Sequence, residues 1–149
     1  MFLYTLFFVT HIVYMTNAVI DVGKLTTKSE VLETEKKTME DCLNKAGLKY
    51  TMLKDHLNGQ TPEATKELKC VLGCYTEELG YVKDKKTQWH VIEMVHQIEY
   101  KTEENLEKGS QILKNCKTIV PEVAVDTCDA GYALYTCYMK QAIKVDLHP

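Results

Sequence analysis

Six cysteines constrain this chain of 149 residues more than any other feature of its sequence. They are Cys42, Cys70, Cys74, Cys116, Cys128 and Cys137. An even number of cysteines predicts a disulfide framework in a short secreted chain. A zinc site is the competing interpretation, but the Cys-x2-Cys and His-x3-His spacings that such sites favour do not occur. We therefore expect disulfides and no metal.

The first 18 residues predict export from the cell. Residues 1–15 are almost entirely apolar, and Thr16 and Ala18 place small residues at the positions that a signal peptidase reads. The apolar stretch is short for a membrane span, which takes about 20 residues. We expect a signal peptide at residues 1–18, one domain at residues 19–149 and an extracellular location.

The net charge argues against nucleic acid as a partner, and the aromatic content shows which rings the domain contains. The net charge is −3 and no basic run occurs, which argues against nucleic acid as a partner. All three phenylalanines lie in the predicted signal peptide, so the domain has Trp89 and seven tyrosines as its aromatic residues.

Turn signals and apolar periodicity predict an all-α domain with six helices. The first expected helix follows the N-cap Thr27 and ends at Gly47, and the second spans roughly 50–57. The third opens at Thr61-Pro62-Glu63 and ends before Gly80. The fourth follows Thr87, the fifth opens at Thr102 and the sixth spans roughly 123–142. The last is apolar nearly all round, so it should be central and buried. We expect no strand of useful length.

Helix geometry limits how the cysteines can pair. Cys70 and Cys74 lie four residues apart in one expected helix, where Cβ atoms are about 5–6 Å apart, whereas a disulfide needs about 3.8 Å. Cys128 and Cys137 are separated by roughly 13 Å along another helix. Six cysteines have 15 connectivities, and ten remain when these two pairs are excluded. In each of the ten, two disulfides join the helix of Cys70 and Cys74 to other parts of the chain.

The cysteine spacing resembles that of the insect odorant-binding proteins with six cysteines, which include the general and pheromone-binding members. Written out, it is Cys42-x27-Cys70-x3-Cys74-x41-Cys116-x11-Cys128-x8-Cys137, and the gaps x3 and x8 are the narrow part of that signature. The resemblance implies a six-helix, disulfide-stapled bundle around an internal hydrophobic pocket. It also implies the bridges Cys42–Cys74, Cys70–Cys128 and Cys116–Cys137, which together form one of the ten permitted connectivities.

An internal pocket needs apolar walls with a few polar groups. Inward residues of the expected helices are candidates for this wall, and the resemblance adds Tyr138 and supports Tyr135. The candidate set is Met52, Leu72, Tyr75, Leu79, Trp89, Ile92, Val95, Leu113, Leu134, Tyr135, Tyr138 and Leu147. Core packing without ligand contact is the alternative for each. A tyrosine-rich wall favours ligands that carry one oxygen, such as an alcohol, ester or aldehyde.

The C-terminal segment, residues 143–149, predicts a lid. Apolar Ile143, Val145 and Leu147 alternate with polar residues, and this period of two gives an extended segment one apolar face. Tails of this length in the resembled family fold over the pocket. His148 is the candidate pH switch, because histidine titrates near pH 6.5. The alternative is that His148, like His56, His90 and His96, is solvated and has no such role.

The expected function is that of a secreted carrier, which binds a small hydrophobic ligand of the odorant or pheromone class and transports it through aqueous extracellular fluid. Further expected partners are an olfactory receptor or a membrane surface, where the ligand would be released, and a second copy of the chain in a weak homodimer. The alternative is a secreted interaction or scavenger protein on the same scaffold. No enzyme activity or cofactor is expected, because no Gly-x-Ser-x-Gly elbow or phosphate-binding glycine loop occurs.

Overall fold

The computed structural model describes residues 20–59 and 63–147, which form six α-helices, one 3-10 turn and a small hairpin. The elements are η1 (Val22–Lys24), α1 (Lys28–Ala46), α2 (Tyr50–Leu57), α3 (Lys66–Glu78), β1 (Val82–Lys83), β2 (Lys86–Thr87), α4 (Trp89–Glu99), α5 (Glu103–Ile119) and α6 (Thr127–Lys144). The predicted all-α class is confirmed. Within the described ranges, no helix has the length and apolar character that a membrane crossing needs. The predicted signal peptide and His148 lie outside the described residues.

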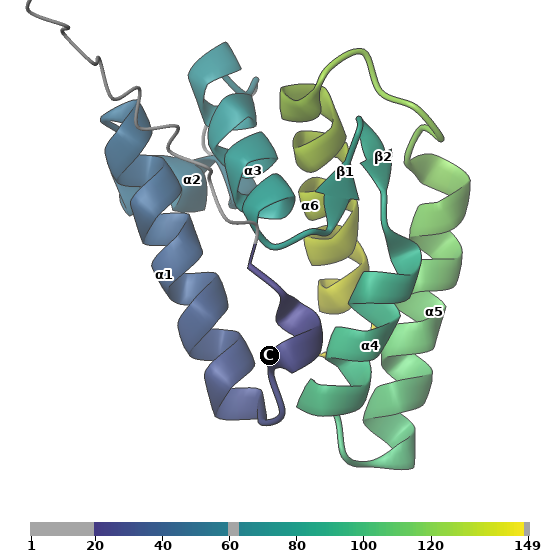
Figure 1. Cartoon of the computed structure of the whole chain (residues 1–149). Helices are drawn as coiled ribbons and strands as arrows, with labels where there is room; N and C mark the ends of the chain where they lie inside the picture. Colours follow the sequence, from purple (N-terminus) through teal and green to yellow (C-terminus); the bar gives the residue numbers. More distant parts are fainter. Residues whose placement is uncertain (1–19, 60–62, 148–149) are drawn as a thin grey trace, which may run out of the picture.

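Helix α6 occupies the centre of the bundle, as its apolar sequence predicts. It packs against α3 on one side and α5 on the other, and α1 packs against α3 and α4 (Figure 1). The buried apolar faces of all six helices meet in one large core cluster. A second cluster lies where α5 and the end of α6 meet Tyr100 and Leu147.

Several helix ends follow the predicted capping residues. Thr27 forms a capping box with Glu30 at the start of α1, and each side chain accepts from the other residue's backbone N–H. Gly47 ends α1 in the left-handed conformation with a φ of 66°. Thr102 caps α5 by accepting from the N–H of Asn105.

Three helices begin later than predicted. Thr65 caps α3 at 3.2 Å from the N–H of Leu68, so this helix begins at Lys66 rather than beside Pro62, which lies outside the described residues. Asp126 caps α6 at 2.8 Å from the N–H of Asp129. The helix therefore begins at Thr127, four residues after the predicted start. The N-cap of α4 is Gln88 instead of Thr87. Because several neighbouring polar residues can cap a helix, periodicity alone does not select among them.

The hairpin was not predicted from the sequence. Strands β1 and β2 pair antiparallel through Val82 with Thr87 and Lys83 with Lys86. The connecting Asp84 and Lys85 both have positive φ, 50° and 63°, as a type I′ turn requires. Its sequence lacks the glycine that normally marks such a turn, and each strand has only two residues.

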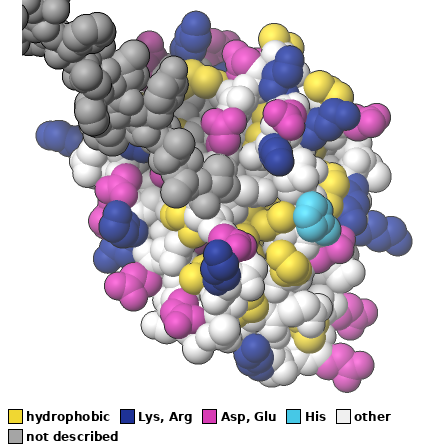
Figure 2. All heavy atoms as spheres, viewed as in Figure 1, with side chains coloured by type: hydrophobic (Ala, Val, Ile, Leu, Met, Phe, Trp, Pro, Cys, Tyr) yellow, Lys and Arg dark blue, Asp and Glu magenta, His cyan; other side chains and the backbone are white. Residues whose placement is uncertain are grey.

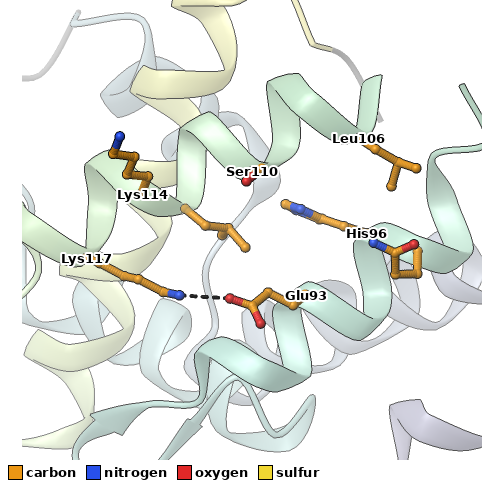
Figure 3. A pocket seen from close by; sticks show the side chains of 8 residues that line it. Glu93, His96, Leu106, Ser110, Lys114 and Lys117 are labelled. Atoms are coloured by element: carbon orange, nitrogen blue, oxygen red, sulfur yellow. Dashed lines mark hydrogen bonds and ion pairs between the residues drawn. The ribbon is translucent and has the colours of Figure 1, made fainter. Parts of the chain in front are cut away.

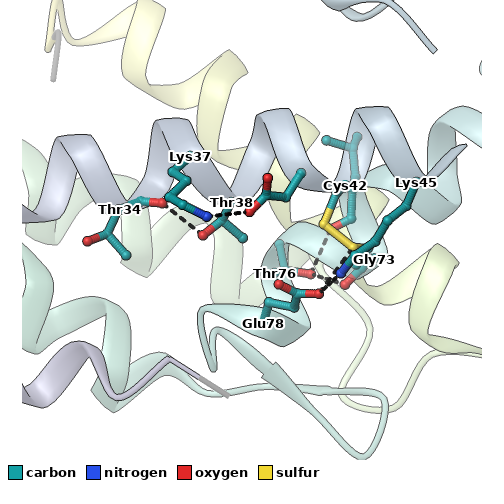
Figure 4. Close-up of a disulfide and its surroundings, with 11 residues drawn as sticks. Thr34, Lys37, Thr38, Cys42, Lys45, Gly73, Thr76 and Glu78 are labelled. Carbon is teal, nitrogen blue, oxygen red and sulfur yellow. Dashed lines mark hydrogen bonds and ion pairs between the residues drawn. A yellow bond between two sulfur atoms is a disulfide. The ribbon is translucent and has the colours of Figure 1, made fainter. Parts of the chain in front are cut away.

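Three disulfides join the helices in the connectivity that the resemblance implies. Cys42–Cys74 joins α1 to α3, Cys70–Cys128 joins α3 to α6, and Cys116–Cys137 joins α5 to α6. Figure 4 shows the first bridge beside the ion pair between Lys45 of α1 and Glu78 of α3. Two disulfides thus leave helix α3, as the geometric argument requires, and they link it to α1 and α6.

Two glycines allow α3 and α6 to approach very closely. A Cβ atom on Gly131 would lie 2.5 Å from the carbonyl oxygen of Leu72 and 2.6 Å from the Cα atom of Gly73. A Cβ atom on Gly73 would lie 2.8 Å from the Cα atom of Cys128. Because backbone rather than flexible side chains would be struck, only glycine fits this crossing. The crossing fixes the two helices that carry Tyr75 and Tyr135.

The C-terminal segment is not extended, so that prediction is wrong. Helix α6 continues to Lys144, and Asp146 then takes a left-handed conformation with a φ of 52°. The N–H of Leu147 donates to the carbonyl of Ala142 at 3.0 Å, as in a Schellman motif. Leu147 is consequently buried in the second core cluster, while Ile143 is 68% exposed.

Candidate ligand-binding cavity

A cavity of about 250 Å³ lies inside the bundle, between side chains of α1, α2, α3, α4 and α6. Its aromatic wall consists of Tyr50, Tyr75, Tyr81, Tyr100, Tyr135 and Tyr138. Its apolar wall consists of Ile92, Val95, Leu134 and Met139, and its polar groups belong to Glu35, Thr76, His96 and Glu99. Tyr50 is 61% exposed and marks an edge that faces solvent, whereas most of the other side chains are buried.

Six of the predicted pocket residues lie in this wall. They are Tyr75, Ile92, Val95, Leu134, Tyr135 and Tyr138. Tyr75 and Tyr135 meet edge to face, with ring centroids 5.8 Å apart and an interplanar angle of 87°. Contact between any of these residues and a ligand stays a prediction.

The other six predicted residues lie elsewhere. Met52 is 43% exposed on α2, and Leu72 and Leu79 are fully buried core residues. Trp89 packs against both core clusters, with the Lys117 ammonium 5.9 Å from the centre of its ring. Leu113 lies on the far side of α4, and Leu147 packs behind Tyr100 in the second cluster. Helical spacing identified inward side chains correctly, but most of the interior is packed core rather than cavity wall.

Glu99 is the cavity residue that the sequence argument missed most clearly. Its side chain is only 7% exposed, and its Oε1 atom has no hydrogen-bond partner among the described residues. Burial raises the pKa of Glu99 from 4.5 to about 7, the nearby Glu35 adds to the shift, and Lys28 opposes it. Glu99 follows Ile92 and Val95 at helical spacing, which would have identified its inward direction.

A second carboxyl group, Glu35, enters the same cavity from α1. Its Oε1 atom accepts a hydrogen bond from the Tyr81 hydroxyl at 2.6 Å. Burial raises the pKa of Glu35, and the Tyr81 hydrogen bond opposes this shift. Glu35 stands on the buried stripe of Val31, Thr38 and Cys42, so its inward direction was also readable from helical spacing.

His96 lies between the cavity and the outside of the bundle. Its Nε2 atom hydrogen-bonds with the Tyr138 hydroxyl at 2.8 Å, and that hydroxyl is 3.4 Å from the hydroxyl of Tyr100. Burial lowers the pKa of His96 from 6.5 to about 4. His96 is therefore neutral near pH 7, and it is buried rather than solvated.

A larger depression of about 500 Å³ lies on the outer side of His96, between α4 and α5 (Figure 3). An ion pair between Glu93 and Lys117, with an N–O distance of 2.8 Å, crosses it. Exposed polar side chains such as Ser110 and Lys114 form much of its lining. Acidic and basic side chains are also interspersed over the face in Figure 2. The internal cavity is the better candidate, because its wall is mostly aromatic and aliphatic and a small apolar ligand gains most from such walls.

One cluster of potential metal ligands occurs in the described part of the chain, at Cys42, Cys74 and Glu78. The two sulfur atoms are bonded to each other, so neither is available as a thiolate.

Helices stapled around an internal, mostly aromatic and apolar cavity define a class of small proteins that bind ligands internally. Residues 24–141 match the sequence model of the PBP/GOBP family, and the chain belongs to this family of odorant-binding carriers, which are not enzymes. A comparison with curated protein sequences finds no match.

Solved structures of insect odorant-binding proteins share the fold. An odorant-binding protein, dmelOBP28a, from Drosophila melanogaster has 23% identity and a TM-score of 0.60 over 81% of this chain and 99% of its own. Odorant binding protein 5 from Apis mellifera has 20% identity and a TM-score of 0.66 over 83% and 98%. The fatty acid binding protein OBP56a from the oral disk of the blowfly Phormia regina has 22% identity and a TM-score of 0.54 over 80% and 98%.

Proposed function

We propose that the protein is a secreted carrier that takes up a small hydrophobic molecule of the odorant or pheromone class and transports it through extracellular fluid. The observation that carries this proposal is the internal cavity of about 250 Å³ with its tyrosine and aliphatic walls. Family membership supports the ligand-binding role, and the three disulfides with the predicted signal peptide support the extracellular location.

The cavity suits a compact ligand. Its volume of about 250 Å³ equals that of roughly eight water molecules, at about 30 Å³ each. Such a ligand would lie between the crossed rings of Tyr75 and Tyr135 and the aliphatic side chains of Ile92, Val95 and Leu134. Burial of apolar ligand surface would supply the affinity, at about 25 cal/mol for each Å².

A fluorescent reporter tests the carrier function. The apolar dye N-phenyl-1-naphthylamine should bind one-to-one, with a blue-shifted and enhanced emission. Val95→Phe should weaken this binding about tenfold or more, because its extra volume enters the cavity. Val91→Phe on the same helix is the matched control, because Val91 does not line the cavity. Failure of the dye to bind the native protein, or equal binding by the Val95 variant when its helical content is unchanged, would contradict the proposal.

A further inference from the structure

Among the described residues, the cavity wall carries two carboxyl groups, and its only basic side chain is the neutral imidazole of His96. Glu35 enters from α1 and Glu99 from α4, and no lysine is among the described residues that line the cavity. The chain has no arginine at all. Buried acids without a positive partner are costly, so their presence in an otherwise aromatic and apolar wall calls for a physical reason.

The partners of the two carboxyl groups differ. Glu35 accepts the hydrogen bond of Tyr81, but Glu99 Oε1 is buried without a partner in the described structure. An unpaired buried oxygen of this kind destabilises the folded protein, and more so when it is charged. A ligand that donates a hydrogen bond to Glu99 would remove this cost on binding.

The groups around Glu99 favour a donor that is also positively charged. From α1, Glu35 adds negative charge, and the exposed Lys28 contributes only a weaker opposing effect. His96 on α4 is neutral near pH 7, as are the buried Tyr75 of α3 and Tyr138 of α6, whose pKa values burial raises. No fixed cation therefore neutralises Glu99 from inside the described cavity wall.

Tyrosine rings provide the second attraction for a cation. Six tyrosines line the cavity, and the face of a tyrosine ring attracts an ammonium group within about 6 Å of its centre. Such an interaction is strongest when it is shielded from water. Carboxylates combined with aromatic faces bind an amine better than an ester or an aldehyde, which can only accept hydrogen bonds.

We propose that the cavity selects small apolar molecules that carry an amine, whose ammonium group donates to Glu99 Oε1 while its apolar part lies among the tyrosine rings. This inference rests on the proposed carrier function and names the chemical class of its ligand. It goes beyond the oxygen-bearing ligands that the tyrosine content alone favours, because the tyrosine hydroxyls at Tyr81 and Tyr138 already have protein partners.

Competition within one matched ligand series tests the selection. 2-Phenylethylamine, 2-phenylethanol and ethylbenzene have nearly the same shape, and each is used to displace N-phenyl-1-naphthylamine at pH 8. The amine should bind at least about tenfold more tightly than the alcohol, which corresponds to one charge-assisted hydrogen bond. Glu99→Gln should remove that advantage, and its affinity for ethylbenzene should change much less than its affinity for the amine. Glu93→Gln, an exposed change on the same helix outside the cavity, should preserve it.

The pH dependence provides a second readout on the unmodified protein. The amine remains protonated from pH 5 to pH 8, since an aliphatic amine titrates near pH 10. Glu99 becomes protonated over the same range, so amine affinity should fall up to about 100-fold between pH 8 and pH 5, while ethylbenzene affinity changes little.

The outcomes separate this inference from the carrier function. Dye binding without preference for the amine at pH 8 would overturn the inference alone. An equal loss of amine and alcohol binding in Glu99→Gln would also overturn it, in favour of neutral hydrogen-bond donors. Absence of dye binding to the native protein would instead overturn the carrier function on which the inference rests.

Discussion

Replacing Cys70 and Cys128 together by alanine is expected to lower the free energy of unfolding by about 4 kcal/mol. The bridge has a sequence separation of 58, the largest of the three, and on the chain-entropy account stabilisation increases with the closed loop. The bridge also joins α3 to α6 beside their closest approach at Gly73 and Gly131. Urea denaturation followed by far-ultraviolet circular dichroism measures the loss.

The Cys116–Cys137 bridge supplies the matched comparison. Its sequence separation is 21, so its removal should cost about 3 kcal/mol, less than removal of Cys70–Cys128. The reverse order of stabilities would show that loop closure is not the dominant contribution. Loss of Cys70–Cys128 should also weaken dye binding more strongly, because α3 and α6 carry the facing residues Tyr75 and Tyr135.

Glu99→Gln is expected to change the free energy of unfolding differently at pH 8 and at pH 4.5. Relative to the native protein, the variant should be more stable at pH 8 than at pH 4.5 by up to about 3 kcal/mol. The folded-state pKa of Glu99 is about 7 and its ordinary value is 4.5. The folded protein therefore binds this proton more tightly than the unfolded chain, and stability is lost as pH rises from 4.5 to 7. One pKa unit corresponds to about 1.4 kcal/mol, and glutamine cannot ionise.

His96 acts in the opposite direction, so the native protein and the variant must be compared at each pH. The pKa of His96 falls from 6.5 to about 4 on folding, and stability is therefore lost as pH falls through that interval. This contribution is present in both proteins and cancels in their difference. A difference between native protein and Glu99→Gln that is independent of pH would contradict the buried position of the carboxylate.

The sequence predicted the scaffold well because its signals are local or covalent. Thr27 and Gly47 mark the ends of α1 through specific backbone conformations, and the cysteine spacing resembles that of a family whose implied bridges are the ones found here. The late start of α3 at Lys66 and the hairpin at Asp84 and Lys85 escaped prediction, because competing capping residues and a turn without glycine leave weak signals.

The cavity wall was only half predictable because periodicity indicates inward direction but not what the side chain meets there. Ile92 and Val95 face the cavity, whereas Leu72 and Leu79, equally apolar and inward, pack in the solid core. Glu99 was missed because acidic side chains are rarely buried, although its spacing placed it on the inward face. The C-terminal segment was misread because alternation over a few residues also fits a helix end with Leu147 folded back.

Intermolecular nuclear Overhauser effects test most directly whether the protein carries its ligand in the internal cavity. The measurement uses N-phenyl-1-naphthylamine bound to protein with labelled isoleucine, leucine and valine methyl groups. The account predicts contacts from the dye to Ile92, Val95 and Leu134, which line the cavity. Contacts confined to Leu106 and Leu113, which line the outer depression between α4 and α5, would contradict it.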